Sequence, residues 1–414
     1  MHDGNTHSEP GARVRELRRR RGMTQEALAE ASGLSVQVIK KIEQGGSARM
    51  ETFRQIAKGL GGGVTTVWFV SPGSPEPIAE TGDAALLAHM RAALTPPVGM
   101  DGSPMFGTAD WDDVALPRLR DAVDAIALAY HGDKYDHLAQ VLPWLIQSAH
   151  HHVAHLDDGN AGREAVRVRA DVLGLAGRYL IQVRAHDLAL TALQQSVRDA
   201  LTIGDMPLAA SAVCSQAWAM LRQGRFDEVE RLCAKAAEDI EPRMSQANGD
   251  ELAAWGWMLM RAAAAAARNN RTDSAHEYLS LAETAGTRLG AERLNFSGHR
   301  AFGPVSVALM RAEVATVSGE PGQALEAMAN ITPDAGRPHA STWNRGQVEK
   351  ARALVEIGHI DEATTLLQRL KAQAPEWLRF QQRARDTAEA ILAARTRVPS
   401  AEQRELANFL QVPN

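Results

Sequence analysis

Apolar residues recur every three or four positions along residues 24–45, TQEALAEASGLSVQVIKKIEQG. This spacing places them on one face of a helix. The pattern is interrupted at Gly33, so it predicts two short helices joined by a turn. Thr24 and Ser35 precede the two helices, where their hydroxyl groups can accept hydrogen bonds from the unpaired N–H groups of the first turn. The second helix is expected to turn its apolar residues inward, namely Leu34, Ile39 and Ile42.

The opposite face of the second helix is expected to be open to a partner. By helical periodicity it carries Val36, Gln37, Lys40, Lys41 and Gln44. A helix with such a face suits the major groove of DNA. Periodicity alone leaves open an ordinary helical hairpin whose polar residues are only solvated.

A longer stretch carries a family pattern. From Val14 to Leu60 the sequence reads VRELRRRRGMTQEALAEASGLSVQVIKKIEQG, followed by a further helix, METFRQIAKGL. This stretch resembles the Xre/Cro family of bacterial helix-turn-helix domains. The resemblance implies a five-helix DNA-binding domain and a double-stranded DNA operator as partner. It also implies that Arg18 and Glu43 form a structural ion pair.

The resemblance assigns roles to the residues of the two short helices. Gln25 and Ser35 would contact phosphates, whereas the start of the second helix would approach base edges. Gln37 can bond an adenine edge, Lys41 can donate to guanine, and Val36 can offer an apolar contact to a thymine methyl group. The expected DNA-binding residues are Gln25, Ser35, Val36, Gln37, Lys40, Lys41 and Arg49.

Charge is distributed unevenly along the chain. The formal net charge is −5. Residues 11–60 nevertheless hold eleven Lys and Arg against five Asp and Glu, a local charge of +6. A basic segment of this kind attracts phosphates, while the acidic remainder would be repelled from DNA. A basic face that is merely solvated is the alternative.

Composition favours an all-α protein. Aromatic residues make up 5% of the chain, and alanine is abundant, which suits packed helices better than sheets. We expect a helix-turn-helix domain over residues 11–70, closed by Val64, Val67 and Trp68. Prolines and glycines predict a linker over 71–110 with a short helix at 84–94. Residues 111–410 would form a helical sensor and dimerisation domain.

The long helical part contains a weak internal repeat. The clearest copy begins at Trp218, WAMLRQGRFDEVERLCAKAAEDIEP, and resembles a tetratricopeptide repeat with Gly224 at its turn. Comparable turns fall at Asn270, Gly319 and Gly358, and two degenerate versions lie upstream. The turns are 39 to 49 residues apart, longer than the roughly 34 of a strict repeat. We expect an α-solenoid, because each hairpin must stack on its neighbours to bury its apolar face; a compact helical bundle is the alternative.

A solenoid has a concave wall formed by the first helix of each hairpin. Registering the hairpins on their turns places five Arg and Trp side chains there, and both residue types are common binding anchors. They are also often core or solvated residues. The expected ligand-binding residues are Arg178, Trp218, Trp257, Arg268 and Arg352.

Other chemistry is poorly supported. His150, His151, His152 and His155 precede Asp157 and Asp158, but the intervening acid of HExxH is missing, so we predict no metal site. Cys214 and Cys233 lack a CxxC pattern and are expected to be buried thiols. Phosphate-loop, dinucleotide and nucleophile-elbow motifs are absent from the sequence. We therefore predict neither an enzyme nor a cofactor.

These features predict a transcriptional regulator. A cytoplasmic location is predicted because the sequence lacks an apolar signal segment and an apolar run long enough to cross a membrane. Its effector would be a peptide or small molecule bound in the helical repeats. A homodimer would read two half-sites, and the effector would alter the dimer or the solenoid curvature. The alternative is a DNA-tethered scaffold whose repeats recruit a protein partner. A third hypothesis is that the helix-turn-helix domain contacts only other proteins.

Overall fold

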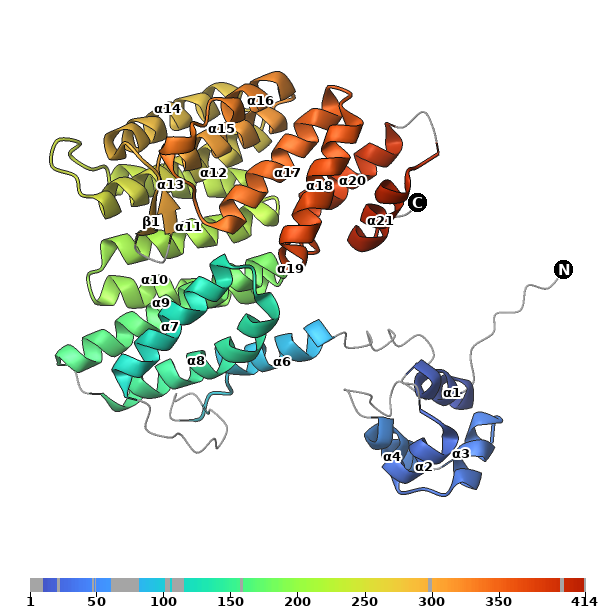
Figure 1. Ribbon diagram of the computed structural model, residues 1–414. Coiled ribbons are helices and arrows are strands. Elements are labelled where there is room, and N and C mark those ends of the chain that lie inside the picture. Colours follow the sequence, from blue (N-terminus) through green and yellow to red (C-terminus); the bar gives the residue numbers. More distant parts are fainter. Residues whose placement is uncertain are drawn as a thin grey trace. The chain divides into compact units, whose positions relative to one another are not determined.

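The chain divides into two compact units, Met1–His89 and Met90–Asn414, shown in a computed structural model (Figure 1). Each unit is described by itself. The structure describes residues 10–20, 23–46, 48, 50–60, 82–100, 105, 115–156, 159–296, 300–394 and 398–412.

The first unit is built from short helices that follow the predicted pattern. Thr24 Oγ1 accepts a hydrogen bond from the Ala27 amide at 3.1 Å, and Ser35 Oγ accepts one from Val38 at 3.4 Å. Gly33 ends the second helix with a φ of 67°, in the left-handed region that favours glycine. The described helices are α1 (Pro10–Arg20), α2 (Gln25–Ser32), α3 (Val36–Glu43) and α4 (Met50–Leu60).

One apolar core holds these four helices together. Its members come from all of them and are at most 1% exposed: Val14, Leu28, Ile39, Ile42 and Ile56. Burial of each such side chain contributes roughly 1.5–3 kcal/mol. Leu34 packs at the edge of this core. The closing segment expected at residues 61–70, with Val64, Val67 and Trp68, lies outside the described residues.

The second unit consists almost entirely of helices, in agreement with the all-α prediction. Helix α6 (Gly82–Leu94) spans the boundary between the two units. The following helices are α7 (Leu116–His131), α8 (Tyr135–His155), α9 (Asn160–Gln182), α10 (His186–Thr202), α11 (Met206–Arg222), α12 (Phe226–Asp239), α13 (Gly249–Arg268), α14 (Thr272–Leu289), α15 (Pro304–Val317), α16 (Pro321–Ala329), α17 (Ala340–Glu356), α18 (Ile360–Gln373), α19 (Pro375–Leu378), α20 (Gln382–Ala393) and α21 (Ala401–Leu410). A 3-10 turn, η1 (Pro333–Ala335), precedes α17.

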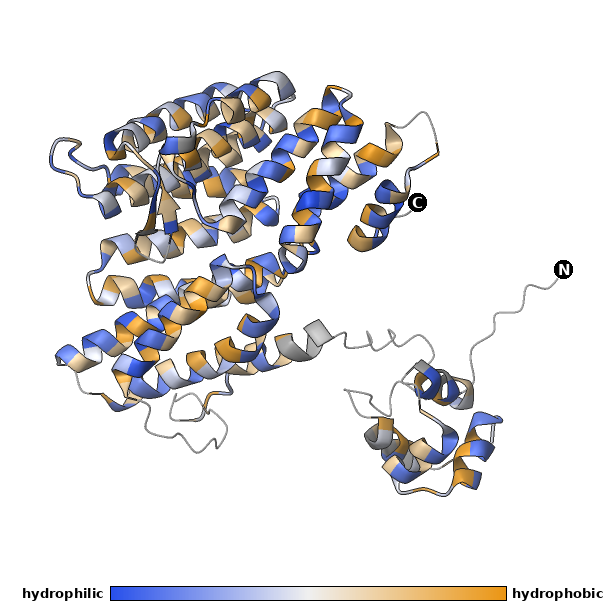
Figure 2. Cartoon of the chain, in the orientation of Figure 1, coloured by the Kyte–Doolittle hydropathy of each residue, from blue (hydrophilic) through white to orange (hydrophobic). Residues whose placement is uncertain are grey.

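These helices pair in chain order as hairpins that stack on one another (Figure 1). The first helix of each hairpin contacts the first helix of the next, through α7, α9, α11, α13, α15, α17 and α20. Hydrophobic residues recur along the helices between hydrophilic ones (Figure 2), as expected when every helix buries one stripe. The first helices therefore form one continuous wall.

The hairpin turns repeat one backbone geometry. Six of them contain a residue in the left-handed region, with φ between 57° and 88°: Asp133, Arg184, Gly224, Asn270, Gly319 and Gly358. The next residue donates its N–H to a carbonyl in the last turn of the preceding helix, as Arg225 does to Met220 at 3.1 Å. This is the Schellman pattern of helix ends. The four turns predicted at Gly224, Asn270, Gly319 and Gly358 are thus confirmed.

Small residues allow the first helices to approach closely. Ala262 to Ala267 of α13 are at most 4% exposed, and a Cβ on Gly346 of α17 would lie 2.4 Å from the Leu309 side chain of α15. Close backbone approach of this kind requires Gly and Ala on the packed faces. Cys214 and Cys233 are buried free thiols in the same core.

A two-stranded antiparallel hairpin interrupts the helices and was not predicted. Strand β1 (Arg293–Phe296) pairs with β2 (Arg300–Phe302), and Arg293 lies opposite Phe302. Phe302 is fully buried, so the hairpin is anchored on α13 and α15, which both contact β2. Strands of four and three residues are too short to show the alternation from which a strand is read.

The hairpin stack curls so that its ends meet. Arg379 Nη2 contacts Asp136 Oδ1 at 2.9 Å, and Arg184 Nη2 donates to Gln382 Oε1 at 2.7 Å. These contacts join α8 and the α9–α10 turn to the segment around α19 and α20, 243 and 198 residues later in the chain, respectively. The concave wall therefore surrounds an interior. Within the described ranges, the structure contains no helix long and apolar enough to cross a membrane.

Candidate nucleic-acid interface and interior cavity

Helix α3 presents most of its predicted outer face to solvent. Gln37, Lys40, Lys41 and Gln44 are exposed, whereas Val36 is half-buried and packs against the core of the unit. The hydroxyl of Ser35 is exposed but already caps α3. The exposed row therefore offers amide and ammonium donors, with a limited apolar contact beside them. Arg49 lies outside the described residues.

An ion pair fixes α3 against α1. Arg18 Nε and Nη2 donate to the two oxygens of Glu43 at 2.6 and 2.9 Å, and Arg18 Nη1 donates to the Met23 carbonyl at 2.8 Å. Arg15 also donates to the Glu43 carbonyl. Burial raises the pKa of Glu43, but its hydrogen bonds with Arg18 and Gln25 and the nearby arginine charges lower it by more. The carboxylate is therefore held ionised and fully partnered.

Gln25 belongs to this same network. Its Nε2 donates to Glu43 Oε2 at 2.7 Å, and the side chain is half-buried. One amide N–H is thus used inside the unit, and the second N–H and the carbonyl oxygen are the groups that could meet a phosphate. The position of Gln25 couples the end of α3 to the start of α2.

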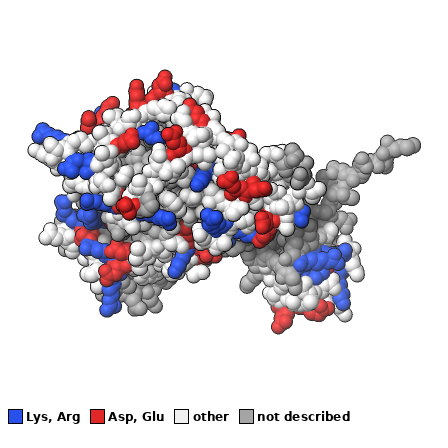
Figure 3. Space-filling model, turned by 45° about the horizontal axis from the view of Figure 1, so that its top comes forward, with Lys and Arg blue, Asp and Glu red and all other residues white. Residues whose placement is uncertain are grey.

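Charge on this unit is separated over the surface. On the face drawn in Figure 3, its Lys and Arg side chains gather apart from its Asp and Glu side chains. Arg19, Lys40 and Lys41 are exposed basic residues, whereas Glu26 and Glu30 are the exposed acids of α2. A phosphate backbone would be attracted to the basic part.

The second unit contains a cavity of about 640 Å³ inside its curved wall. Its lining comes from α11, α12, α13, α15, α17, α19 and α20. Three of the predicted ligand-binding residues line it, namely Trp218, Arg268 and Arg352. A smaller pocket, of about 40 Å³, is lined by the other two, Arg178 and Trp257. The two spaces adjoin, because Trp218, Arg261 and Arg345 line both.

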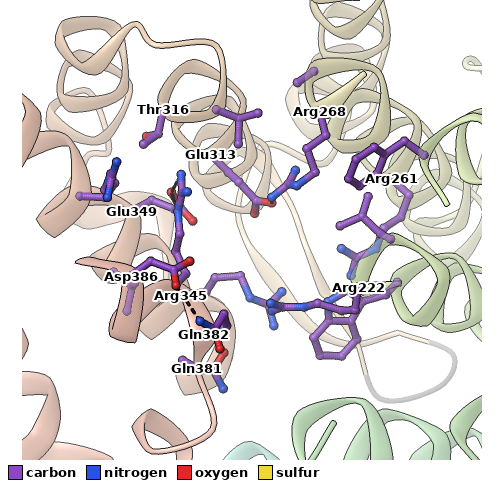
Figure 4. Close-up of a pocket in the computed structure, with 18 of the residues that line it drawn as sticks. Arg222, Arg261, Arg268, Glu313, Thr316, Arg345, Glu349, Gln381, Gln382 and Asp386 are labelled. Carbon is purple, nitrogen blue, oxygen red and sulfur yellow. Dashed lines mark hydrogen bonds and ion pairs between the residues drawn. The ribbon is translucent and has the colours of Figure 1, made fainter. Parts of the chain in front are cut away.

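Carboxylates in the large cavity are already occupied by neighbours. Arg268 Nη2 contacts Glu313 at 2.8 Å, Arg383 contacts Glu349 at 3.1 Å, and Arg352 contacts Glu356 at 2.7 Å. Burial raises the pKa of Glu313, but Arg268, Arg345 and Arg261 bring it down to about 2. Burial raises the pKa of Glu349 despite the Arg383 charge. The fourth acid, Asp386, accepts from Gln382 at 2.7 Å (Figure 4).

Three other arginines surround the ring of Trp218. Their guanidinium carbons lie 4.6, 5.4 and 5.9 Å from its ring centroid for Arg345, Arg261 and Arg222, respectively. We call Arg222, Arg261 and Arg345 the arginine triad. Within the described part of the chain, none of the three donates a hydrogen bond to a carboxylate, and the buried Nε atoms of Arg261 and Arg345 have no hydrogen-bond partner. All three guanidinium groups make cation–π contacts with Trp218, and Arg261 and Arg345 also act on Glu313 through their charge.

Arginine–aromatic contacts continue into the small pocket. Trp257 lies between Arg261 and Arg300, each 5.3 Å from its centroid, and its Nε1 donates to the Ala301 carbonyl at 2.9 Å. Arg178 lies 5.6 Å from the ring of Tyr130. Burial lowers the pKa of Arg178 to about 10. The interior is therefore rich in cations along its whole wall.

The triad was missed by sequence reasoning, although a signal was present. Arg222 follows Trp218 by four residues, and Arg261 and Arg345 each precede a predicted wall arginine by seven. Both spacings return a side chain to the same helix face. A search one or two helical turns along the same helix face from each predicted wall residue would have identified all three arginines.

The histidine-rich segment lies at the end of α8. The rings of His151 and His155 stack with centroids 4.0 Å apart, and His152 Nδ1 contacts the Ser148 carbonyl at 2.8 Å. Where the structure describes the chain, no three His, Cys, Asp or Glu side chains are grouped to hold a metal ion. Asp157 and Asp158 lie outside the described residues.

Comparisons with known proteins bear mainly on the first unit. Residues 14–68 match the helix-turn-helix family model. No curated protein matches the chain. Among solved structures, the chain is similar to the crystal structure of the PrgX/iCF10 complex, over 97% of this chain and 94% of that chain, at 12% identity and a TM-score of 0.27. That score is too low to support a conclusion about fold. This match identifies an Xre-type helix-turn-helix domain, a DNA-binding module, in residues 14–68.

Proposed function

We propose that this protein is a sequence-specific transcriptional regulator whose helical repeats bind a peptide or small-molecule effector. The observation that carries the proposal is the helix-turn-helix match over residues 14–68, together with an exposed polar row on α3. Gln37 and Lys41 read base edges in this proposal, and Val36 supplies a minor apolar contact. Ser35, Lys40, Arg49 and the unused amide atoms of Gln25 contact phosphates.

The interior cavity supports an effector rather than a protein partner. Its volume of about 640 Å³ falls within the range of small-molecule sites. The lining is contributed by hairpins far apart in the chain, so a ligand there contacts several of them at once. A protein partner of a scaffold would instead need an open surface of roughly 800 Å² on each side. A concave site of this volume favours a small molecule or a short peptide.

We propose that the regulator acts as a homodimer. One helix-turn-helix module buries limited DNA surface, so two copies on two half-sites supply the affinity. In this proposal the effector changes the curvature of the hairpin stack, whose ends are joined by contacts such as that of Arg379 with Asp136. A changed curvature alters the spacing of the two DNA-binding units.

Selection of bound sequences from a random DNA library tests the proposal with the full-length chain. We expect a palindromic motif, with an affinity that falls steeply between about 50 and 200 mM salt. Lys41→Gln should weaken binding, whereas Lys134→Gln, an exposed lysine before α8, should not. Binding without sequence preference or salt dependence would contradict a DNA-reading role and favour a protein-contact role for α3.

A further inference from the structure

We propose that the arginine triad at Trp218 binds an anionic oxygen group of the effector, either a carboxylate or a phosphate. This inference rests on the proposed function, because it takes the interior cavity to be the effector site. It adds the chemical class of the ligand and the place where its charged group lies.

The charge balance of the cavity is the first observation. Six arginines and four carboxylates line it. Three of the carboxylates contact arginines outside the triad, and the fourth, Asp386, accepts from Gln382. The lining therefore carries an excess of two arginines over carboxylates, and the arginines without a carboxylate contact among the described residues are Arg222, Arg261 and Arg345. Arg261 is the buried member of the triad, and a buried arginine without a carboxylate contact is costly for the fold. A ligand anion would supply the missing partner.

The unused donors are the second observation. Arg261 is 3% exposed, and its Nε has no hydrogen-bond partner among the described residues; the same is true of Arg345 Nε. In Figure 4, the Arg345 side chain extends across the cavity toward Arg222. Each guanidinium carries five N–H donors in a planar fork, a geometry that matches a carboxylate or a phosphate. Donors from three helices thus converge on one region of the cavity.

Mutual repulsion within the triad is consistent with this reading. Arg222 is an exposed residue, but its side chain lies at the wall of the cavity, among the other lining residues. This enclosure, followed by the positive charge of Arg345, lowers the pKa of Arg222 to about 10. An anion placed between the guanidinium groups would offset both effects. Because the triad joins α11, α13 and α17, the same anion would also link three hairpins of the stack.

The site can be tested without knowing the effector. The full-length chain is labelled with 5-fluorotryptophan, the ¹⁹F resonance of Trp218 is assigned with Trp218→Phe, and inorganic phosphate and acetate are titrated separately. We expect a saturable shift of this resonance with one or both anions. The anion that binds more tightly indicates whether the effector carries a phosphate or a carboxylate. The double variant Arg222→Gln with Arg345→Gln should lose at least tenfold in affinity.

Matched controls locate the effect. Arg225→Gln removes an exposed arginine paired with Glu228 and should leave anion binding unchanged. If circular dichroism shows that the double variant is unfolded, Arg222→Gln alone, at a solvent-accessible position, should still weaken binding at least threefold. No shift of the Trp218 resonance with either anion would overturn the proposal. Equal binding by the folded double variant and the natural chain would also overturn it.

The two proposals fail in distinguishable ways. Anion titration is performed without DNA, and operator affinity is measured on the same preparations. A chain that binds phosphate at Trp218 but shows no sequence-specific DNA binding would contradict the proposed function alone. A chain that binds its operator while the Trp218 resonance stays unchanged would contradict the inference about the effector.

Discussion

The two units differ in whether a buried arginine has hydrogen-bond partners for its side chain. In the helix-turn-helix unit, Arg18 is 8% exposed, and three of its nitrogens donate hydrogen bonds, two of them to Glu43. In the interior of the helical unit, Arg261 is 3% exposed, and its Nε lacks a hydrogen-bond partner among the described residues. The first arrangement completes a fold. The second leaves directional donors unused at the wall of a cavity.

This difference separates structural charge from charge reserved for a ligand. A paired buried arginine contributes to stability mainly because removing either partner strands the other. An unpaired one lowers stability and is tolerated where it serves binding. Burial alone therefore does not identify a binding residue. A binding arginine is identified instead by hydrogen-bond donors that have no partner within the protein.

Breaking the pair in the first unit should produce the largest effect. Arg18→Ala leaves Glu43 buried with only Gln25 and Arg15 nearby, and the loss of a buried pair costs about 3–5 kcal/mol. We expect helices α1 to α4 to unfold while the helical unit remains folded. Hydrogen exchange of the full chain, resolved by peptide, measures both units at once. Arg19→Ala, at an exposed position of α1, is the control, and normal protection in Arg18→Ala would show that the pair is dispensable.

A buried carboxyl without a cation gives the next largest effect. Burial, aided by the Glu376 charge, raises the pKa of Asp133 to about 7 despite its hydrogen bonds with Tyr135 and Asn344. The folded state therefore binds a proton more tightly than the unfolded state. The contribution of Asp133 to stability falls as pH rises from about 4 to 7 and then stays constant.

Replacement of Asp133 should remove this dependence. Asn tolerates the left-handed φ of 59° at this position, so Asp133→Asn should be more stable than the natural chain at pH 8, by up to ~4 kcal/mol. The gain should vanish near pH 4. Urea unfolding of both proteins across this range measures the difference. Asp121→Asn, an exposed acid of α7, should follow the natural chain, and a gain in Asp133→Asn that is independent of pH would contradict the assignment.

Much of the helix-turn-helix unit could be predicted from local sequence. Thr24, Gly33 and Ser35 determine where its helices begin and end through interactions within four residues, and such interactions are visible in the sequence. The hairpin turns of the second unit are also local, so Gly224 and Gly358 marked them correctly. Local backbone chemistry therefore located helix ends and turns, whereas the all-α prediction came from composition.

The interior site depended on interactions between distant residues. The contact between Arg268 and Glu313 joins residues 45 positions apart, and the cavity needs hairpins from Trp218 to Asp386. Registering the hairpins on their turns identified the face of each first helix, which is why the five predicted wall residues line the two spaces. It could not show which arginines have carboxylate partners. Arg268 has a carboxylate partner and, among the described residues, Arg261 does not, and this difference arises from tertiary structure.

Changing the exposed polar row of α3 should have a moderate effect on DNA binding. Gln37→Ala removes a side chain that can bond a base bidentately, so we expect a loss of about 1–3 kcal/mol and a relaxed preference at one base position. Stability should not change, because Gln37 is exposed. Sequence selection with both proteins measures the preference. Gln55→Ala on α4, also exposed, is the matched control, and an unchanged motif in Gln37→Ala would place another residue at that base.

The smallest predicted effect concerns the cost of an unpaired arginine. The pKa of Arg222 is lowered to about 10 by the enclosure of the cavity and by Arg345, so the folded state disfavours its charge. Because Arg222 is an exposed residue, screening by solvent reduces the penalty to about 1 kcal/mol. Arg222→Met keeps an apolar stem beside Trp218 and should be more stable than the natural chain by about that amount.

Phosphate should reduce the difference in stability between Arg222→Met and the natural chain. If the triad binds phosphate, the bound anion stabilises the natural chain by mass action. The difference in free energy of unfolding between Arg222→Met and the natural chain should then become smaller. Thermal unfolding in buffers with and without phosphate, at matched ionic strength, measures the change. Arg225→Met, at an exposed arginine paired with Glu228, should gain no stability in either buffer. A loss of stability in phosphate-free Arg222→Met would mean that this arginine supports the fold as Arg18 does, and the contrast between the two units would not extend to it.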